Sequence, residues 1–132
     1  GLVGEGGRGV LEVLWAQWWP QLASGPEEAA RSTVAWLGPC IGPGAFEVGG
    51  EVREGVVAAD AQAQSRFQPQ AGGKWLADLP GLARDRLARI GLHQVHGNDG
   101  SAEWCTVSNP SRFFSHRRDR VSGRFAASVW IG

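Results

Sequence analysis

The sequence has no methionine, no tyrosine, only two cysteines and no excess of charge of either sign. Its 13 basic and 13 acidic side chains cancel, so no overall field favours nucleic acid or an anionic membrane surface as a partner. No run approaches the ~18 uninterrupted apolar residues of a membrane span, and no basic-then-apolar leader opens the chain. We therefore expect a cytoplasmic protein without nucleic acid or membrane partners, whose true start lies upstream of Gly1.

The two cysteines, Cys40 and Cys105, lie far apart and form no C-x-x-C pair. They would form a disulfide only if the fold brought their α-carbons within ~7 Å. We expect two free thiols, as is usual in a reducing compartment.

The length and composition are those of one globular domain. A chain of 132 residues has room for a single core. Apolar residues make up 42% and charged residues 20%, which is ordinary globular usage and argues against disorder.

An aromatic helix is predicted over residues 8–22. Leu11, Trp15, Trp18 and Leu22 recur every three or four residues, so they share one face, and Pro20 is expected to end or bend the helix. Ordinary core packing is the favoured interpretation. The alternative is association through this tryptophan-rich helix, with exposed apolar surface if part of the domain is absent.

The clearest helix is predicted over residues 75–90. Asp78 is suited to cap its start, Pro80 is tolerated in the first turn and Gly91 terminates it. We interpret its charged residues as a solvated face, with an anion-binding patch as the alternative; they are Arg84, Asp85, Arg86 and Arg89.

The other segments mix helix and strand. A helical turn is predicted at 27–31, a buried strand at 33–37, a helix at 49–60, a polar surface connection after it, and extended segments at 92–96, 104–107 and 125–131. The predicted class is α+β.

Three ordered blocks resemble the YfiH-like family. Residues 35–54 read A-W-L-G-P-C-I-G-P-G-A-F-E-V-G-G-E-V-R-E and are similar to that family's A-W-L-G-P-x-I-G-P-x-x-F-E-V-G-x-E-V motif. K-W-L-A-D-L follows at 74–79, then C-T at 105–106, F-F-S-H-R-R-D at 113–119 and S-G-R at 122–124. The similarity covers residues 34–131.

The resemblance implies that residues 1–132 are the carboxy-terminal part of a single domain about twice as long, a four-layer α/β sandwich with mixed sheets. The family is described both as laccase-like polyphenol oxidase and as purine nucleoside phosphorylase. Its metal is zinc, or copper in the laccase description, held by His and Cys residues of Q-V-H-G, D-C-x-P and H-A-G-W-R-G motifs that precede the G-P-x-I-G-P loop.

This chain is expected to lack those ligands. Residues 4–9 resemble a remnant of H-A-G-W-R-G, with Gly4 at the His position and Arg8 retained. Q-V-H-G occurs at 94–97, but its neighbours place it in the carboxy-terminal region. A substitute set of His93, His96 and Cys105 is the alternative; on a regular strand the two histidines would face opposite ways.

Candidate site residues follow. The loop at 38–44 is a candidate pocket wall, with a rigid structural turn as the alternative, and it carries Cys40, which we expect to serve packing more than nucleophilic attack. Phe46 is a candidate to face a purine ring. Arg117 and Arg118 offer guanidinium forks for phosphate, unless Asp119 pairs with them structurally, and the resemblance adds Arg8 as a further phosphate residue.

The resemblance implies that the intact protein is a zinc-dependent purine nucleoside phosphorylase acting on adenosine or inosine with phosphate, with adenosine deamination as a related activity. The alternatives are a catalytically inactive remnant acting by association, and a hydrolase that edits peptidoglycan precursors in the intact protein. Phenol oxidation ranks last, because it requires redox-active copper.

Overall fold

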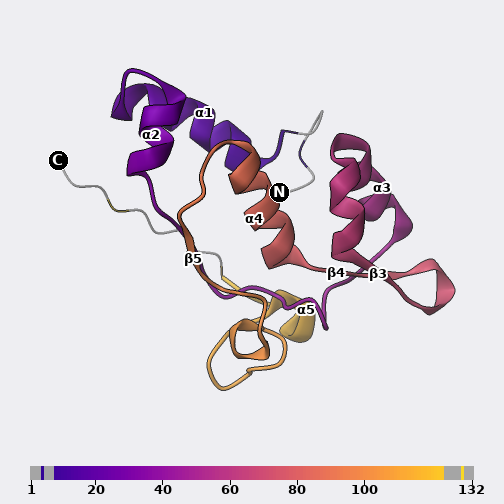
Figure 1. The fold of residues 1–132 in the computed structure, drawn as a ribbon. Helices are drawn as coiled ribbons and strands as arrows, with labels where there is room; N and C mark the ends of the chain where they lie inside the picture. Colours follow the sequence, from indigo (N-terminus) through magenta and orange to yellow (C-terminus); the bar gives the residue numbers. More distant parts are fainter. Residues whose placement is uncertain (1–3, 5–7, 124–128, 130–132) are drawn as a thin grey trace.

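The computed structural model describes residues 4, 8–123 and 129, which form a mixed α and β fold (Figure 1). The helices are α1 (Val10–Leu22), α2 (Pro26–Ser32), α3 (Gly50–Ala59), α4 (Leu79–Arg89) and α5 (His116–Asp119). The strands are β1 (Ala35–Leu37), β2 (Glu47–Val48), β3 (Phe67–Pro69), β4 (Trp75–Ala77) and β5 (Val95–Gly97). Short 3-10 helices are η1 (Ala61–Arg66), η2 (Ala71–Gly73) and η3 (Ala102–Trp104).

The strands form two small sheets, one parallel and one antiparallel. β1 and β5 are parallel, whereas β4 lies between β2 and β3 in an antiparallel sheet. This mixture confirms the predicted α+β class.

Helix α4 joins two apolar clusters. Leu82 packs with the antiparallel sheet and α3, in a cluster that includes Val48, Val56 and Phe67. Leu87, one and a half turns later, packs with α1 and α2, in a cluster around Trp15. In Figure 1, α4 accordingly lies between the α1–α2 pair and α3.

The predicted single apolar face of α1 is wrong. Leu11, Trp15 and Trp19, spaced by four residues, face the cluster with α2 and α4. Trp18 and Leu22 are exposed. Pro20 lies inside the helix, which continues to Leu22. The helix tolerates this proline because Pro20 belongs to its last turn.

The helix predicted over 75–90 begins later than expected. Residues Trp75–Ala77 form strand β4, because they pair with strands on both sides. The Asp78 cap is confirmed, since its carboxylate accepts a hydrogen bond from the Gly81 N–H. The Gly91 terminator is also confirmed, because its φ of +89° is a left-handed value that favours glycine.

The charged residues of α4 form a solvated face only in part, since Arg89 is exposed but Arg86 is buried. Arg86 is 2% exposed and pairs with Glu12 of α1, and Arg89 pairs with Asp60. Arg84 donates to the carbonyls of Val95 and Asn98. The rest of the prediction failed because these partners are distant in sequence.

Other expectations were met in part. The helix at 49–60 and the strand at 33–37 are present with shorter bounds. The connection after α3 is the 3-10 helix η1, with Ala63 buried, followed by strand β3. The extended segment at 104–107 reduces to one bridge between Cys105 and Cys40. Residues 5–7 and most of the segment expected at 125–131 lie outside the described residues.

Candidate functional site

Asn98 fixes the loop at 38–44. This side chain is 1% exposed, and its amide nitrogen donates to the Gly38 carbonyl at 3.1 Å and to the Cys40 sulfur at 3.4 Å. Its amide oxygen accepts from the Gly100 N–H at 2.9 Å. One buried amide therefore ties the end of β1 to the turn after β5.

The two cysteines are neighbours and free thiols. The Thr106 N–H donates to the Cys40 carbonyl at 2.9 Å, and the Gly42 N–H donates to the Cys105 sulfur at 3.2 Å. The sequence alone could not place them together, because the residues between them span most of the fold.

The two thiols differ in acidity. Burial raises the pKa of the Cys40 thiol to about 11, although the hydrogen bond from Asn98 opposes this rise. Burial also acts to raise the pKa of Cys105, but hydrogen bonds from Ser108 and the Gly42 backbone outweigh it and lower the pKa overall. Cys40 is therefore a protonated thiol at neutral pH, a poor nucleophile.

Arg117 and Phe46, two candidates chosen separately from the sequence, lie together. The Arg117 guanidinium carbon lies 5.5 Å from the centre of the Phe46 ring. Its Nη1 donates to the Glu47 carbonyl at 2.8 Å, which anchors α5 beside β2. Arg117 is exposed and Phe46 is half-buried, so a charged group and an aromatic ring meet at the surface.

Arg118, in contrast, points into the protein. Its Nη1 donates to the carbonyls of Thr106 and Val107, and its Nη2 to that of Phe113. Nε and Nη2 also donate to the two oxygens of the Asp119 carboxylate, each at 2.7 Å. The hydrogen bonds between Arg118 and Asp119 lower the pKa of the Asp119 carboxyl and raise the pKa of the Arg118 guanidinium. All the guanidinium nitrogens are thus engaged within the protein.

Arg8 lies at the start of α1. It is exposed and precedes α1, where it borders an open hollow with Val10 and Leu14.

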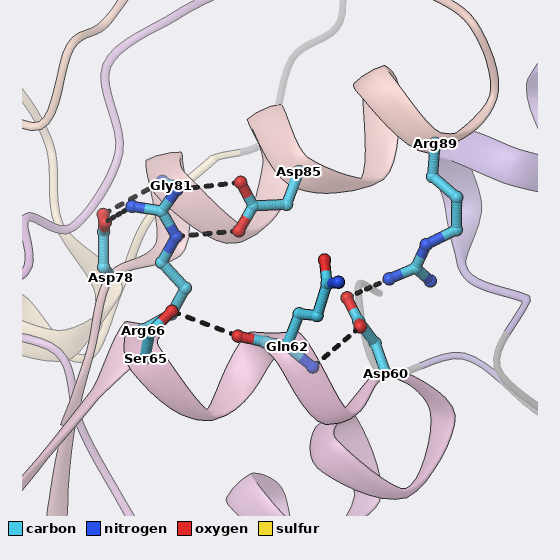
Figure 2. Close-up of polar contacts among 8 residues, drawn as sticks. All are labelled: Asp60, Gln62, Ser65, Arg66, Asp78, Gly81, Asp85 and Arg89. Carbon is cyan, nitrogen blue, oxygen red and sulfur yellow. Dashed lines mark hydrogen bonds and ion pairs between the residues drawn. The ribbon is translucent and has the colours of Figure 1, made fainter.

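A charged cavity that the sequence did not reveal lies beside the loop at 38–44. It has a volume of about 230 Å³ and is lined by Pro43 of that loop together with Ser65, Arg66, Gln68, Leu76 and Asp78. Figure 2 shows Arg66 held between two carboxylates of the α4 region. Its Nε and Nη2 contact both oxygens of Asp85 at 2.7 and 2.8 Å, and Nη1 contacts Asp78 at 3.1 Å.

These contacts restrict what the cavity can bind. Because both Asp78 and Asp85 neutralise Arg66, an anion would have to compete with two carboxylates for the guanidinium. Sequence reasoning missed this cluster because Arg66 lies in a polar segment that gave no periodic signal.

The described residues do not supply a metal site. No group of three His, Cys, Asp or Glu side chains with ligand geometry occurs among them. His93 and His96 are exposed while Cys105 is buried, so the substitute set is not assembled. Gly4, which the resemblance places at the family's histidine position, has no side chain to offer. Zinc requires about three protein ligands at a catalytic site, and this part of the chain does not fit it.

The chain matches known proteins along its whole length. The family profile described as multi-copper polyphenol oxidoreductase laccase matches residues 1–132. The Escherichia coli protein named purine nucleoside phosphorylase YfiH is 45% identical over 126 residues, covering 96% of this chain and 48% of that protein. A purine nucleoside phosphorylase of Pseudomonas aeruginosa is 47% identical, covering 86% of this chain and 49% of that protein. The chain thus spans about half the length of these relatives.

Solved structures agree with the fold. A Bacillus licheniformis protein titled YfiH superposes with a TM-score of 0.67 at 26% identity, over 82% of this chain and 39% of that one. A Neisseria meningitidis protein superposes with a TM-score of 0.58 at 43% identity, over 64% of this chain and 33% of that one. None of the helices in the described ranges has the length and apolar content that crossing a bilayer requires. The match over all 132 residues and these similarities show that the chain belongs to the YfiH-like family of laccase-like polyphenol oxidoreductases.

Proposed function

We propose that this chain is the carboxy-terminal part of a purine nucleoside phosphorylase that cleaves adenosine or inosine with phosphate. Its relatives from Escherichia coli and Pseudomonas aeruginosa carry that name. The observation that carries the proposal is the pairing of Arg117 with Phe46 at the surface. A nucleoside and phosphate together present a flat ring and an anion, and an aromatic side chain beside a guanidinium is suited to both.

The proposed reaction needs an anion held in place. A phosphate oxygen forms a bond to C1′ of the ribose while the bond from C1′ to the purine nitrogen breaks, and the base leaves with the electron pair and takes up a proton. Arg117 uses Nη1 for the Glu47 carbonyl. We assign the remaining N–H donors of Arg117 to phosphate. Because the guanidinium stays positively charged, it would hold the anion without gaining or losing a proton.

The other two arginines have lesser roles in this proposal. Arg118 holds the backbone of residues 106–113 and thereby positions α5, which carries Arg117. Arg8 would contribute to phosphate binding only if the remainder of the domain brought it near α5. Cys40 supports the loop beside Phe46 and takes no chemical part, because its thiol is protonated.

The zinc implied by the family resemblance would be bound by residues outside the described part of this chain, because the described residues do not form a group that fits zinc. When bound, such an ion supplies Lewis acidity and an activated water, which also suits adenosine deamination. We place the intact enzyme in the cytoplasm, where its two free thiols would stay reduced.

The test uses an intact-length protein in which residues 10–132 of this chain follow the preceding part of the Escherichia coli relative, including the segment of that relative that replaces residues 1–9 and with it Gly4, and zinc is supplied. We expect phosphate-dependent conversion of inosine to hypoxanthine and, in a parallel assay with adenosine, adenine or ammonia. The variant Arg117→Ala should lower kcat/KM for inosine about 10- to 100-fold, because a hydrogen bond to a charged group is worth ~1.5–3 kcal/mol.

Arg112→Ala is the matched control. Arg112 is also exposed and lies 5.0 Å from the ring centre of Phe113, but it is not part of the proposed site. Equal activity of the Arg117→Ala variant and the parent would show that the residue assignment is wrong. A folded, zinc-loaded parent protein that leaves both nucleosides intact in the presence of phosphate would overturn the proposed activity itself.

A further inference from the structure

We propose that Cys40 and Cys105 are a site of reversible oxidation, at which a small-molecule disulfide such as oxidised glutathione converts the two free thiols into one intramolecular disulfide. The new bond would join the loop at 38–44 to the segment that begins at Cys105. The proposal concerns the chemical state of the two thiols and does not depend on the proposed activity.

The two cysteines lie directly opposite each other on neighbouring segments of the backbone. They form an isolated parallel β-bridge, and the N–H of the next residue, Thr106, donates to the Cys40 carbonyl at 2.9 Å. Backbones paired in this way lie ~4.8 Å apart. Disulfides require α-carbons separated by ~4.4–6.8 Å. The backbone therefore permits a disulfide between Cys40 and Cys105 without a rearrangement of the chain.

The two sulfur atoms contact the same peptide group. The Cys40 Sγ donates to the Ile41 carbonyl at 3.4 Å, and the Gly42 N–H donates to the Cys105 Sγ at 3.2 Å. This carbonyl and this N–H belong to one peptide bond. Glycine permits the close approach, because a Cβ at position 42 would lie 3.0 Å from the Cβ of Cys105 and 3.2 Å from its sulfur. No side chain at position 42 therefore separates the thiols.

The two thiols differ in ways that suit two successive steps. Cys40 is half-buried, so a small molecule can reach it, whereas Cys105 is 4% exposed. Burial raises the pKa of Cys40 to about 11, so a first step at this thiol is slow at neutral pH. Burial also opposes ionisation of Cys105, but hydrogen bonds from Ser108 and the Gly42 backbone outweigh it and lower the pKa of Cys105. Cys105 thus supplies the thiolate that the second step needs.

Two thiol–disulfide exchanges complete the oxidation. The Cys40 thiolate attacks one sulfur of oxidised glutathione, so a bond between Cys40 and glutathione forms while the glutathione disulfide breaks and one glutathione thiolate leaves. The Cys105 thiolate then attacks the Cys40 sulfur, which forms the protein disulfide and releases the second glutathione. Each attacking thiol gives its proton to water and each leaving thiolate takes one up. Two protein thiols are oxidised and one glutathione disulfide is reduced to two thiols.

The bond would connect the segments that carry the two candidate site residues. Phe46 follows the loop at 38–44. On the other side of the bond, Arg118 of α5 donates to the carbonyl of Thr106, the residue after Cys105. Oxidation would therefore fix the backbone that anchors α5 relative to this loop.

The test compares formation of the disulfide in the folded and the unfolded chain. The 132-residue chain is equilibrated with mixtures of reduced and oxidised glutathione, in buffer and in concentrated urea, starting from either redox state. After alkylation and digestion with trypsin, mass spectrometry detects the bond as a link between peptides 32–53 and 90–112, each of which contains one cysteine. We expect half-oxidation of the folded chain at a value of [GSH]²/[GSSG] about 100-fold higher than for the unfolded chain, because the fold aligns the two thiols. The measurement in buffer is repeated with the intact-length protein, which yields the same two peptides.

The matched control is the double variant Cys105→Ser with Thr106→Cys, with its fold verified by tryptophan fluorescence. It moves one thiol by a single position, from which the side chain leaves the extended backbone on the opposite side. In urea it should match the parent, because the sequence separation is nearly the same, but in buffer it should lose most of the 100-fold difference. The proposal is overturned if the parent forms only mixed disulfides with glutathione, if folded and unfolded parent are half-oxidised at the same ratio, or if the control matches the parent in buffer.

Discussion

The buried ion pair between Arg86 and Glu12 should be a large single contribution to the attachment of α1. Glu12→Gln removes the charge of the carboxylate but keeps an oxygen, so the hydrogen bond from the Gly9 N–H to that side chain can persist. Arg86 would remain buried, with side-chain exposure of 3%, and without an opposite charge. Its Nη2 already lacks a hydrogen-bond partner in the described part of the protein.

The magnitude follows from this burial. Removing one partner of a buried pair costs ~3–5 kcal/mol, and Glu12 is 14% exposed at its side chain, so we expect about 3 kcal/mol, toward the lower end. In urea, followed by tryptophan fluorescence, the midpoint should fall by about 1–2 M. The double variant Glu12→Gln with Arg86→Met should recover most of the loss, because no buried charge remains.

The control for this prediction is Glu28→Gln on the exposed surface of α2, which should change stability by less than ~0.5 kcal/mol. If Glu12→Gln shifts the midpoint no more than Glu28→Gln, or if the double variant is less stable than Glu12→Gln, the argument from burial is refuted.

Two further predictions concern a thiol and a helix end. Alkylation of Cys40 by iodoacetamide, followed by mass spectrometry, should accelerate about tenfold per pH unit from pH 7 to 9 without levelling off, because its pKa is about 11 and only the thiolate reacts; a plateau near pH 8 would contradict the raised pKa. Gly91→Ala should lower the free energy of unfolding by about 1 kcal/mol, because φ at this position is +89°. Unchanged thermal stability of that variant would show that the left-handed turn is not required.

The ends of helix α4 were predictable from the sequence, because the residues that fix them lie within a few positions of the helix. Asp78 caps α4 and Gly91 ends it because both act on the adjacent backbone. Strand β4 was missed for the opposite reason: Trp75 and Leu76 suit the helical pattern, but pairing with β2 and β3 decides their conformation.

Contacts between distant segments were beyond sequence reasoning. Glu12 and Arg66 form ion pairs with charged residues of α4 that the sequence predicts to be solvated. The same limit applies to the candidate site, where Arg117 and Phe46 were each chosen by residue type but only the fold places one over the other. Periodicity also failed to show that α1 has two apolar sides, because a single helical face accounts for the spacing equally well.

The most direct test of the account is phosphorus NMR of inosine and phosphate incubated with the zinc-loaded, intact-length protein. A phosphorolytic enzyme should give a ribose 1-phosphate signal that grows with hypoxanthine release, and this signal should be strongly reduced in the Arg117→Ala variant. Hypoxanthine release without any ribose 1-phosphate would contradict the assignment of this chain to a phosphorolytic enzyme.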